Sequence, residues 1–149
     1  MPKTNLLRVY VDADVLYRAT SASHQATASL ALLYLGQATV LEVVTSRYTL
    51  QEALRNLERR SPTLAMDLLK LVEQSVEVVE SPPGSVVGRF VGQADPKDLP
   101  NLAAAVTTGA HLILTFNGRD YYPVPELIRV MTPGDLVLRV RAALAGLAV

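Results

Sequence analysis

The stretch Val9-Tyr10-Val11-Asp12-Ala13-Asp14-Val15-Leu16 decides how the rest of this chain can fold. Its first three residues end an apolar run that begins at Leu6, and such a run is typical of a strand buried on both faces of a parallel sheet. Two carboxylates follow at once, one residue apart, and a helical pattern begins after them. We therefore expect Asp12 at the C-terminal tip of a buried strand, the edge at which open α/β sheets place their ligands.

Strand and helix patterns alternate along the whole chain. Apolar runs typical of strands cover about 6–11, 40–45, 76–79, 112–116 and 127–131. Helical spacing covers about 14–35, with a break near 21–24, and then about 50–60, 62–74, 98–107 and 133–145. The segment 86–91 fits either a short helix or an extended piece. This order predicts a single α/β domain over 1–149, a three-layer α/β/α sandwich with a mainly parallel central sheet.

Composition narrows the setting of the protein. The chain has 149 residues and no cysteine, which excludes disulfides and thiolate metal sites and favours a reducing cytoplasm. Fourteen basic and fourteen acidic residues give no net charge, so the basic excess of a general nucleic-acid binder is missing. This does not exclude nucleic-acid binding, because the local distribution of charge matters more than the sum. The N-terminus lacks a signal-peptide pattern. The longest apolar stretch, about 30–44, is broken by Gly36, Gln37 and Glu42, so we expect no membrane span.

Three further acids stand at the ends of other predicted elements, where they can meet Asp12. Glu52 lies at the rim of the apolar face of its helix, Asp98 begins an alanine-rich helix, and Asp120 follows the fourth strand together with Thr115 and Asn117. Each acid also has an ordinary explanation, as a solvated surface residue, a helix cap or a turn residue.

Convergence of these acids would require a counter-charge. Two like charges about 4 Å apart repel by roughly 4 kcal/mol at an effective dielectric constant near 20. All-oxygen ligands suit Mg²⁺ or Mn²⁺ rather than zinc, and the two histidines, His24 and His111, have no metal-ligand spacing. A carboxylate-held cation of this kind serves phosphoryl chemistry.

One reading of the first motif is a phosphatase. Asp-x-Asp-x-Val after an apolar strand resembles the opening of the haloacid dehalogenase-like phosphatases, in which Asp12 would be the nucleophile and Asp14 would handle the proton. Thr115 can serve as the later hydroxyl residue of that family. The lysine that the family places after it is missing, because Lys97 is the last lysine of the chain.

The order of all the motifs resembles the PIN domain, the metal-dependent ribonuclease fold that includes the toxins of bacterial toxin–antitoxin pairs. Four segments carry the resemblance across almost the whole chain: 11–16, 45–54, 95–105 and 112–123. Thr132-Pro133 before the last helix also suits the family. The chain departs from the pattern at Asn117, which holds the strict fourth-acid position, at Pro100, which replaces a polar residue, and at an extra tyrosine before Pro123.

The resemblance implies a Mg²⁺- or Mn²⁺-dependent endoribonuclease that cleaves single-stranded or structured RNA by water attack on phosphorus. It implies metal binding by Asp12, Glu52 and Asp98 and a fourth charge from Asp120. It also implies orientation of a metal ligand or water by Asn117 and Asp120, and a hydrogen bond from Thr115 to Asp12 or to the phosphate. It also implies a homodimer and a protein antitoxin. Arg47, Arg55 and Arg119 are candidates for RNA phosphate contacts. Besides the phosphatase, a non-catalytic PIN relative that binds RNA or protein remains open, which Asn117 and the neutral net charge favour.

Overall fold

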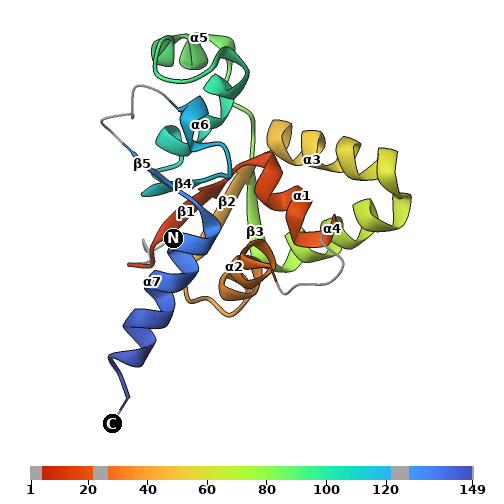
Figure 1. The fold of residues 1–149 in the computed structure, drawn as a ribbon. Coiled ribbons are helices and arrows are strands. Elements are labelled where there is room, and N and C mark those ends of the chain that lie inside the picture. The colour runs from red at the N-terminus through yellow and green to blue at the C-terminus, as the bar shows by residue number, and fades with distance from the viewer. Residues whose placement is uncertain (1–4, 22–26, 122–127, 149) are drawn as a thin grey trace.

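A five-stranded parallel sheet forms the centre of the molecule. The computed structural model describes residues 5–21, 27–121 and 128–148. The sheet order is β3-β2-β1-β4-β5, so the strand that carries the first motif lies in the middle (Figure 1). All four strand pairings are parallel. The strands are β1 (Arg8–Val11), β2 (Glu42–Ser46), β3 (Val76–Val79), β4 (Leu112–Leu114) and β5 (Arg129–Met131).

Helices cover both faces of this sheet because the strands are apolar on both faces. Val9 and Val11 of β1 point into one core, which is closed by α1 (Ala13–Ser21), α2 (Ala28–Gln37), α3 (Arg47–Arg60), α4 (Pro62–Ser75) and α7 (Pro133–Ala145). Tyr10 points the other way, into a core shared with Phe90 and the alanine-rich helix α6 (Leu99–Thr107). Alternation along β1 therefore builds two cores on one strand. The expected three-layer α/β/α sandwich with a parallel sheet is confirmed.

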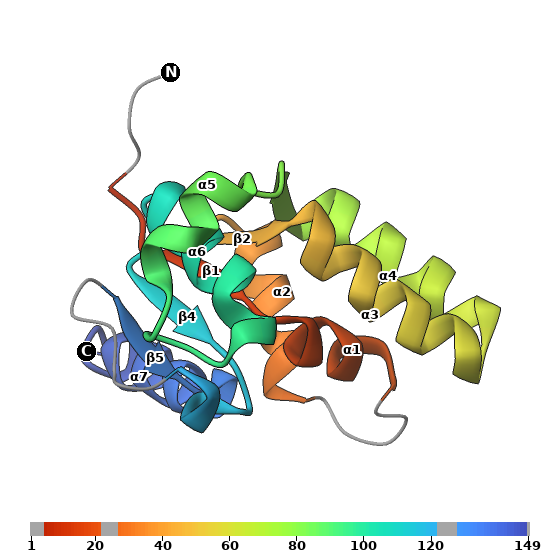
Figure 2. The ribbon, with the colours of Figure 1, turned by 90° about the horizontal axis from the view of Figure 1, so that it is seen from above.

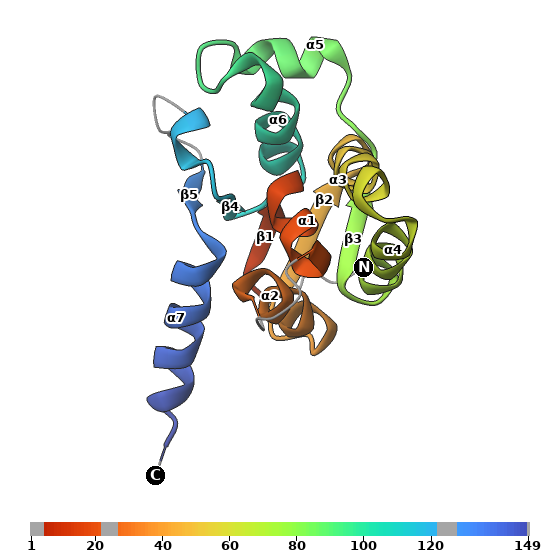
Figure 3. The ribbon, with the colours of Figure 1, turned by 45° about the vertical axis from the view of Figure 1, so that its right-hand side comes forward.

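Two helical features extend away from this body. Helices α3 and α4 form an antiparallel pair joined at Ser61 and project to one side of the sheet (Figures 1 and 2). Helix α7 starts after β5 and runs back past the far edge of the sheet (Figure 3), so residues 141–148 are all exposed. Among the described helices, none combines the length and apolar composition that a membrane crossing needs.

The expected boundaries differ from the structure mainly at the carboxyl edge of the sheet. The strand expected to reach residue 116 ends at Leu114, because the Phe116 amide donates to the Asp14 side chain rather than to a neighbouring strand. The open segment 86–91 is helical: α5 (Gly84–Val87) leads into a 3₁₀ turn, η1 (Gly88–Phe90). Helix α1 ends at Ser21 and α2 begins at Ala28, while residues 22–24 of the expected break and Leu127 of the expected fifth strand lie outside the described residues.

Candidate active site

Asp12 is the fixed point of the site. Its amide donates to the Leu114 carbonyl at 3.1 Å, which extends the β1–β4 ladder by one residue and places the carboxyl group at the sheet edge. The side chain is 7% exposed. Its two oxygens accept four hydrogen bonds of 2.7–3.1 Å, from Ala13 N, Asn101 Nδ2, Thr115 Oγ1 and Tyr121 OH. Because each of its two oxygens accepts two of these hydrogen bonds, the carboxylate is fixed in one orientation.

A polar cavity of about 170 Å³ opens over Asp12. It gathers residues from β1, α3, the 3₁₀ turn η2 (Pro96–Asp98) and the segment around the 3₁₀ turn η3 (Gly118–Asp120). All the acids that were predicted to meet line this one cavity, together with Asn117: Asp12, Glu52, Asp98 and Asp120. Thr115 acts from beneath, through its hydrogen bond to Asp12. Tyr48, Asn56 and Lys97 complete much of the wall and were not anticipated.

Asn101 joins two of the acids and was missed by the sequence analysis. Its Nδ2 lies 3.1 Å from Asp12 Oδ1 and 3.4 Å from Asp98 Oδ1. Its Oδ1 accepts hydrogen bonds from Thr49 Oγ1 and, at 3.1 Å, from Tyr10 OH, so the amide cannot flip. A signal was present, since a residue three places after Asp98 shares its face of the helix. A buried network that also includes Ser46 thereby supports the acids from below.

Asp14 fixes the segment that follows β4, in addition to its place in the first turn of α1. Its Oδ2 accepts from Phe116 N and Asn117 Nδ2, each at 3.0 Å, and from Thr115 Oγ1 at 3.3 Å. These contacts tie the start of α1 to the segment that follows β4. Asn117, predicted to orient a ligand or water, donates its amide to Asp14 instead in this arrangement.

The cavity is poor in compensating charge. Burial and the charge of Asp12 raise the pKa of Asp98 to about 7 and that of Asp14 to about 6. Burial also raises the pKa of Asp12, and burial and Asp12 raise that of Glu52. Lys97 is the cation of the lining, and its Nζ lies 3.5 Å from Asp120 Oδ2. One exposed ammonium thus faces several carboxylates.

The donor set fits a hard divalent cation. Every side-chain donor is an oxygen of a carboxylate or amide, which Mg²⁺ and Mn²⁺ prefer. Among the described residues, Asp98 Oδ2 and Asp14 Oδ1 are buried and have no hydrogen-bond partner, and buried oxygens left in this way are normally satisfied by a ligand, an ion or water. Within the same residues, no three acidic or histidine side chains are already closed into a metal-binding cluster. A cation would therefore have to draw the walls of the cavity together.

The predicted phosphate-binding arginines lie outside this cavity. Arg47 pairs with Glu80 at 2.9 Å on an exposed surface. Arg55 lines a separate open hollow beside Glu58, and Arg119 is exposed in η3. Of the histidines, His111 accepts a hydrogen bond from the Arg8 amide at 3.0 Å, while His24 lies outside the described residues.

The fold with this acidic sheet edge is the PIN fold that the motif order predicted. Three solved structures share it. The chain aligns with PAE2754 from Pyrobaculum aerophilum over 91% of its own length and 96% of that chain, with a TM-score of 0.64 and 22% identity. It aligns with VapBC2 from Rickettsia felis, solved bound to a DNA fragment from their promoter, over 83% and 97%, with a TM-score of 0.61 and 14% identity.

The third structure is VapC20 from Mycobacterium tuberculosis, a toxin that cleaves the sarcin–ricin loop. The alignment covers 74% of this chain and 90% of that one, with a TM-score of 0.55 and 16% identity. No protein-family model matches the sequence, and no curated protein does. At these identities the likeness establishes the fold alone.

Proposed function

We propose that the protein is a Mg²⁺- or Mn²⁺-dependent endoribonuclease that cleaves single-stranded RNA. The observation that carries this proposal is the shared cavity at the carboxyl end of the sheet. There, five carboxylates from four separate parts of a PIN fold line one cavity, and the pKa of Asp98 rises to about 7. Such an accumulation of like charge is destabilising unless a cation occupies it. An open, carboxylate-lined cation site is the arrangement used for phosphodiester hydrolysis.

The roles of the side chains follow from their places. Asp12, Glu52 and Asp98 would hold the cation, and Asp120 would add a fourth charge. When bound, the cation supplies the positive charge that activates water for attack on phosphorus and stabilises the leaving oxygen. Thr115, Tyr121 and Asn101 orient the Asp12 carboxylate, and Asp14 fixes the loop that carries Asn117. Arg47, Arg55 and Arg119 remain proposed contacts to RNA phosphates at a distance from the cavity.

Incubation with a mixed RNA pool tests this proposal. The wild type, Asp12→Asn and the control Asp67→Asn, an exposed acid of α4, are compared in Mn²⁺ and in chelator. We expect cleavage by the wild type and the control in Mn²⁺ only, and at least a hundredfold slower cleavage by Asp12→Asn, because one ligand is lost. Equal rates for the wild type and Asp12→Asn would remove the nuclease assignment from these residues.

The phosphatase is the second candidate, favoured by the Asp12-Ala13-Asp14 motif at the strand tip. In that chemistry Asp14 must carry a proton, whereas the structure uses its Oδ2 to bind the loop after β4. An asparagine keeps one oxygen for these contacts. Asp14→Asn should therefore largely spare RNA cleavage. Hydrolysis of p-nitrophenyl phosphate that is lost in this variant would favour the phosphatase.

The non-catalytic PIN relative is distinguished by metal binding. Titration calorimetry with Mn²⁺ should show binding near or below millimolar concentration in the wild type and weaker binding in Asp12→Asn. No heat of binding in either protein would favour the inert reading, in which the cavity only presents a surface to RNA or protein.

We also propose two protein partners, a second copy of the chain and an antitoxin. The Rickettsia felis neighbour was solved as VapBC2, a protein complex. Apolar side chains that a partner can cover, such as Met66 and Leu69, stand 59% and 48% exposed on α4. Light scattering on the purified chain, alone and mixed with a candidate antitoxin protein, measures both associations. The lack of cysteine fits our expectation of a cytoplasmic protein.

A further inference from the structure

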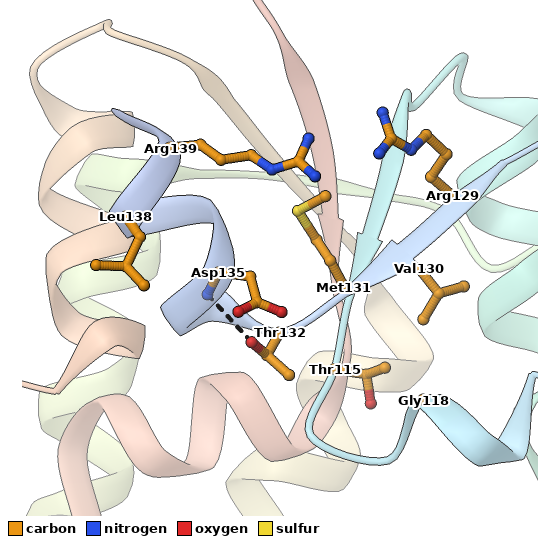
Figure 4. Close-up of a pocket in the computed structure, with 9 residues that line it drawn as sticks. All are labelled: Thr115, Gly118, Arg129, Val130, Met131, Thr132, Asp135, Leu138 and Arg139. Carbon is orange, nitrogen blue, oxygen red and sulfur yellow. Dashed lines mark hydrogen bonds between the residues drawn. The ribbon is translucent and has the colours of Figure 1, made fainter. Parts of the chain in front are cut away.

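A second and larger cavity, of about 490 Å³, lies beside the acidic one. Figure 4 shows it between the edge strand β5 and the first turns of α7. Its lining is chemically unlike that of the acidic cavity, because it combines two arginines with aliphatic side chains. No step of the proposed hydrolysis uses it.

The charged part of this cavity consists of Arg129 on β5 and Arg139 on α7. Figure 4 shows both guanidinium groups at the same end of the cavity, close to the Met131 side chain. Within the described residues neither arginine makes an ion pair, in contrast to Arg8 and Arg47. Asp135 is the acid of the lining, so two cations face one anion. Exposed guanidinium groups without a protein partner are suited to a phosphate, which they bind through paired N–H donors.

The uncharged part is a short aliphatic wall. Val130 and Met131 of the edge strand form one side, and Leu138, which is 60% exposed, forms the other. Bases splayed out of a single strand are bound by stacking on aromatic rings or arginine guanidinium planes, and positive charge binds the backbone; here the arginines can supply both, and the aliphatic wall can exclude water from a base. The cavity thus offers both halves of a nucleotide-binding site, a phosphate clamp and an apolar wall.

Its position connects it to the acidic cavity. Thr115 lines the arginine cavity, and its hydroxyl donates to Asp12 Oδ2 at 3.0 Å in the acidic one. Gly118 also lines the arginine cavity, while its neighbours Asn117 and Asp120 line the acidic one. The short segment 115–120 is therefore the wall between them. A chain held with one phosphodiester over Asp12 can place an adjoining nucleotide across this wall.

We propose that the cavity formed by Arg129, Met131, Leu138 and Arg139 is a subsite for a nucleotide that adjoins the cleaved phosphodiester of single-stranded RNA. This inference rests on the proposed ribonuclease function for the identity of the polymer. The arginines hold a backbone phosphate and the aliphatic wall contacts the base. The subsite binds without regard to the metal, so it can be measured when no cleavage occurs.

The test is binding of a fluorescein-labelled oligouridylate of about 12 nucleotides, a length within the range of known single-strand sites. It is measured by anisotropy in chelator at several salt concentrations. The variants are Arg129→Ala, Arg139→Ala and their combination, and the matched control is Arg141→Ala, an exposed arginine of α7 outside the cavity. We expect each cavity variant to weaken binding about 5- to 10-fold. Each should also lower the slope of log K against log salt by about 0.7, the value for one lost phosphate contact.

Three results would overturn the subsite. Unchanged binding in the double variant means that RNA does not use the cavity. An equal loss in Arg141→Ala means that general surface charge, not the cavity, attracts the RNA. A change of oligomeric state in the double variant with unaltered RNA binding means that the cavity serves a protein interface.

The outcome is separable from that of the ribonuclease proposal. If the cavity variants lose RNA binding and the wild type cleaves no RNA, the subsite proposal is supported and the ribonuclease proposal is refuted. Conversely, suppose that Mn²⁺-dependent cleavage is abolished by Asp12→Asn but runs at full rate in the double variant Arg129→Ala/Arg139→Ala. The ribonuclease proposal is then supported and the subsite proposal is refuted.

Discussion

Replacing Asp12 by asparagine should make the metal-free protein more stable. Asp12 Oδ1 and Asp98 Oδ1 contact the same Asn101 nitrogen at 3.1 and 3.4 Å, so they lie at most about 6.5 Å apart. At that separation, two full charges repel by at least about 2.5 kcal/mol at an effective dielectric constant of about 20. Asparagine removes this repulsion. It also keeps an acceptor for Ala13 N and Asn101 Nδ2, while the Thr115 and Tyr121 hydroxyls can turn to accept from its amide.

We therefore expect Asp12→Asn to raise the free energy of unfolding by about 2 kcal/mol at pH 8 in chelator. For a chain of this size that corresponds to a rise in Tm of about 4–8 °C. The sign of the pH dependence follows from Asp98. Its pKa is about 7 in the folded state and 3.8 for an unperturbed aspartate, so the native protein binds the proton more tightly. Stability of the metal-free wild type therefore falls as pH rises from about 4 through 7, and the advantage of the variant shrinks at pH 5.

Differential scanning fluorimetry and urea titration at pH 5 and pH 8 measure this difference. The control is Asp67→Asn, which removes one exposed acid from α4 and should shift Tm by less than about 1 °C. Mn²⁺ at about a hundredfold excess over its Kd should reverse the order at pH 8, because it stabilises the wild type by about 2.7 kcal/mol. A variant that is no more stable than the wild type at pH 8 in chelator would refute the argument that charge repulsion strains this site.

Three further predictions concern the scaffold. Asn101→Leu should lower the free energy of unfolding by about 2–4 kcal/mol in urea titration, because four side chains lose a buried hydrogen-bond partner: Asp12, Asp98, Thr49 and Tyr10. A loss below about 0.5 kcal/mol would contradict the role of Asn101 as the link between Asp12 and Asp98. Thr132→Ala should lower the free energy of unfolding by about 1 kcal/mol, because Thr132 Oγ1 accepts a hydrogen bond from the Asp135 amide at 3.1 Å at the start of α7. Ser61→Ala should lower it little, because Ser61 makes no side-chain cap bond to α4. Equal effects of the two variants would contradict the capping argument. Gly36→Ala should lower the free energy of unfolding by about 1–3 kcal/mol in the same assay, despite the better helix propensity of alanine. The reason is that a β-carbon there would stand 2.7 Å from the Ser75 carbonyl oxygen and 2.9 Å from Val43 Cγ2. A neutral or stabilising result would show that α2 can shift.

Local sequence patterns predicted much of the fold. The bounds of β3 and α7 match their expected ranges, and the apolar run before Asp12 became the central strand. These features are local, since period and capping chemistry are readable within a window of about ten residues. The expected fourth strand was too long at its end, and the cause lies far away in the sequence. The Thr115 amide still donates to the Met131 carbonyl, but the Phe116 amide donates to the Asp14 side chain.

The sequence by itself determined the alternation of strands and helices, and it predicted, without deciding, that Asp12, Glu52, Asp98 and Asp120 meet at one edge of the sheet. Only the tertiary structure decided how that edge is held. Asn101 and Tyr121 reach Asp12 across 89 and 109 positions of the chain, and Arg129 and Arg139 meet Thr115 in a cavity that no motif marks. The physical reason is that a hydrogen bond or a cavity wall depends on which elements pack together, and that information lies in no single stretch of residues.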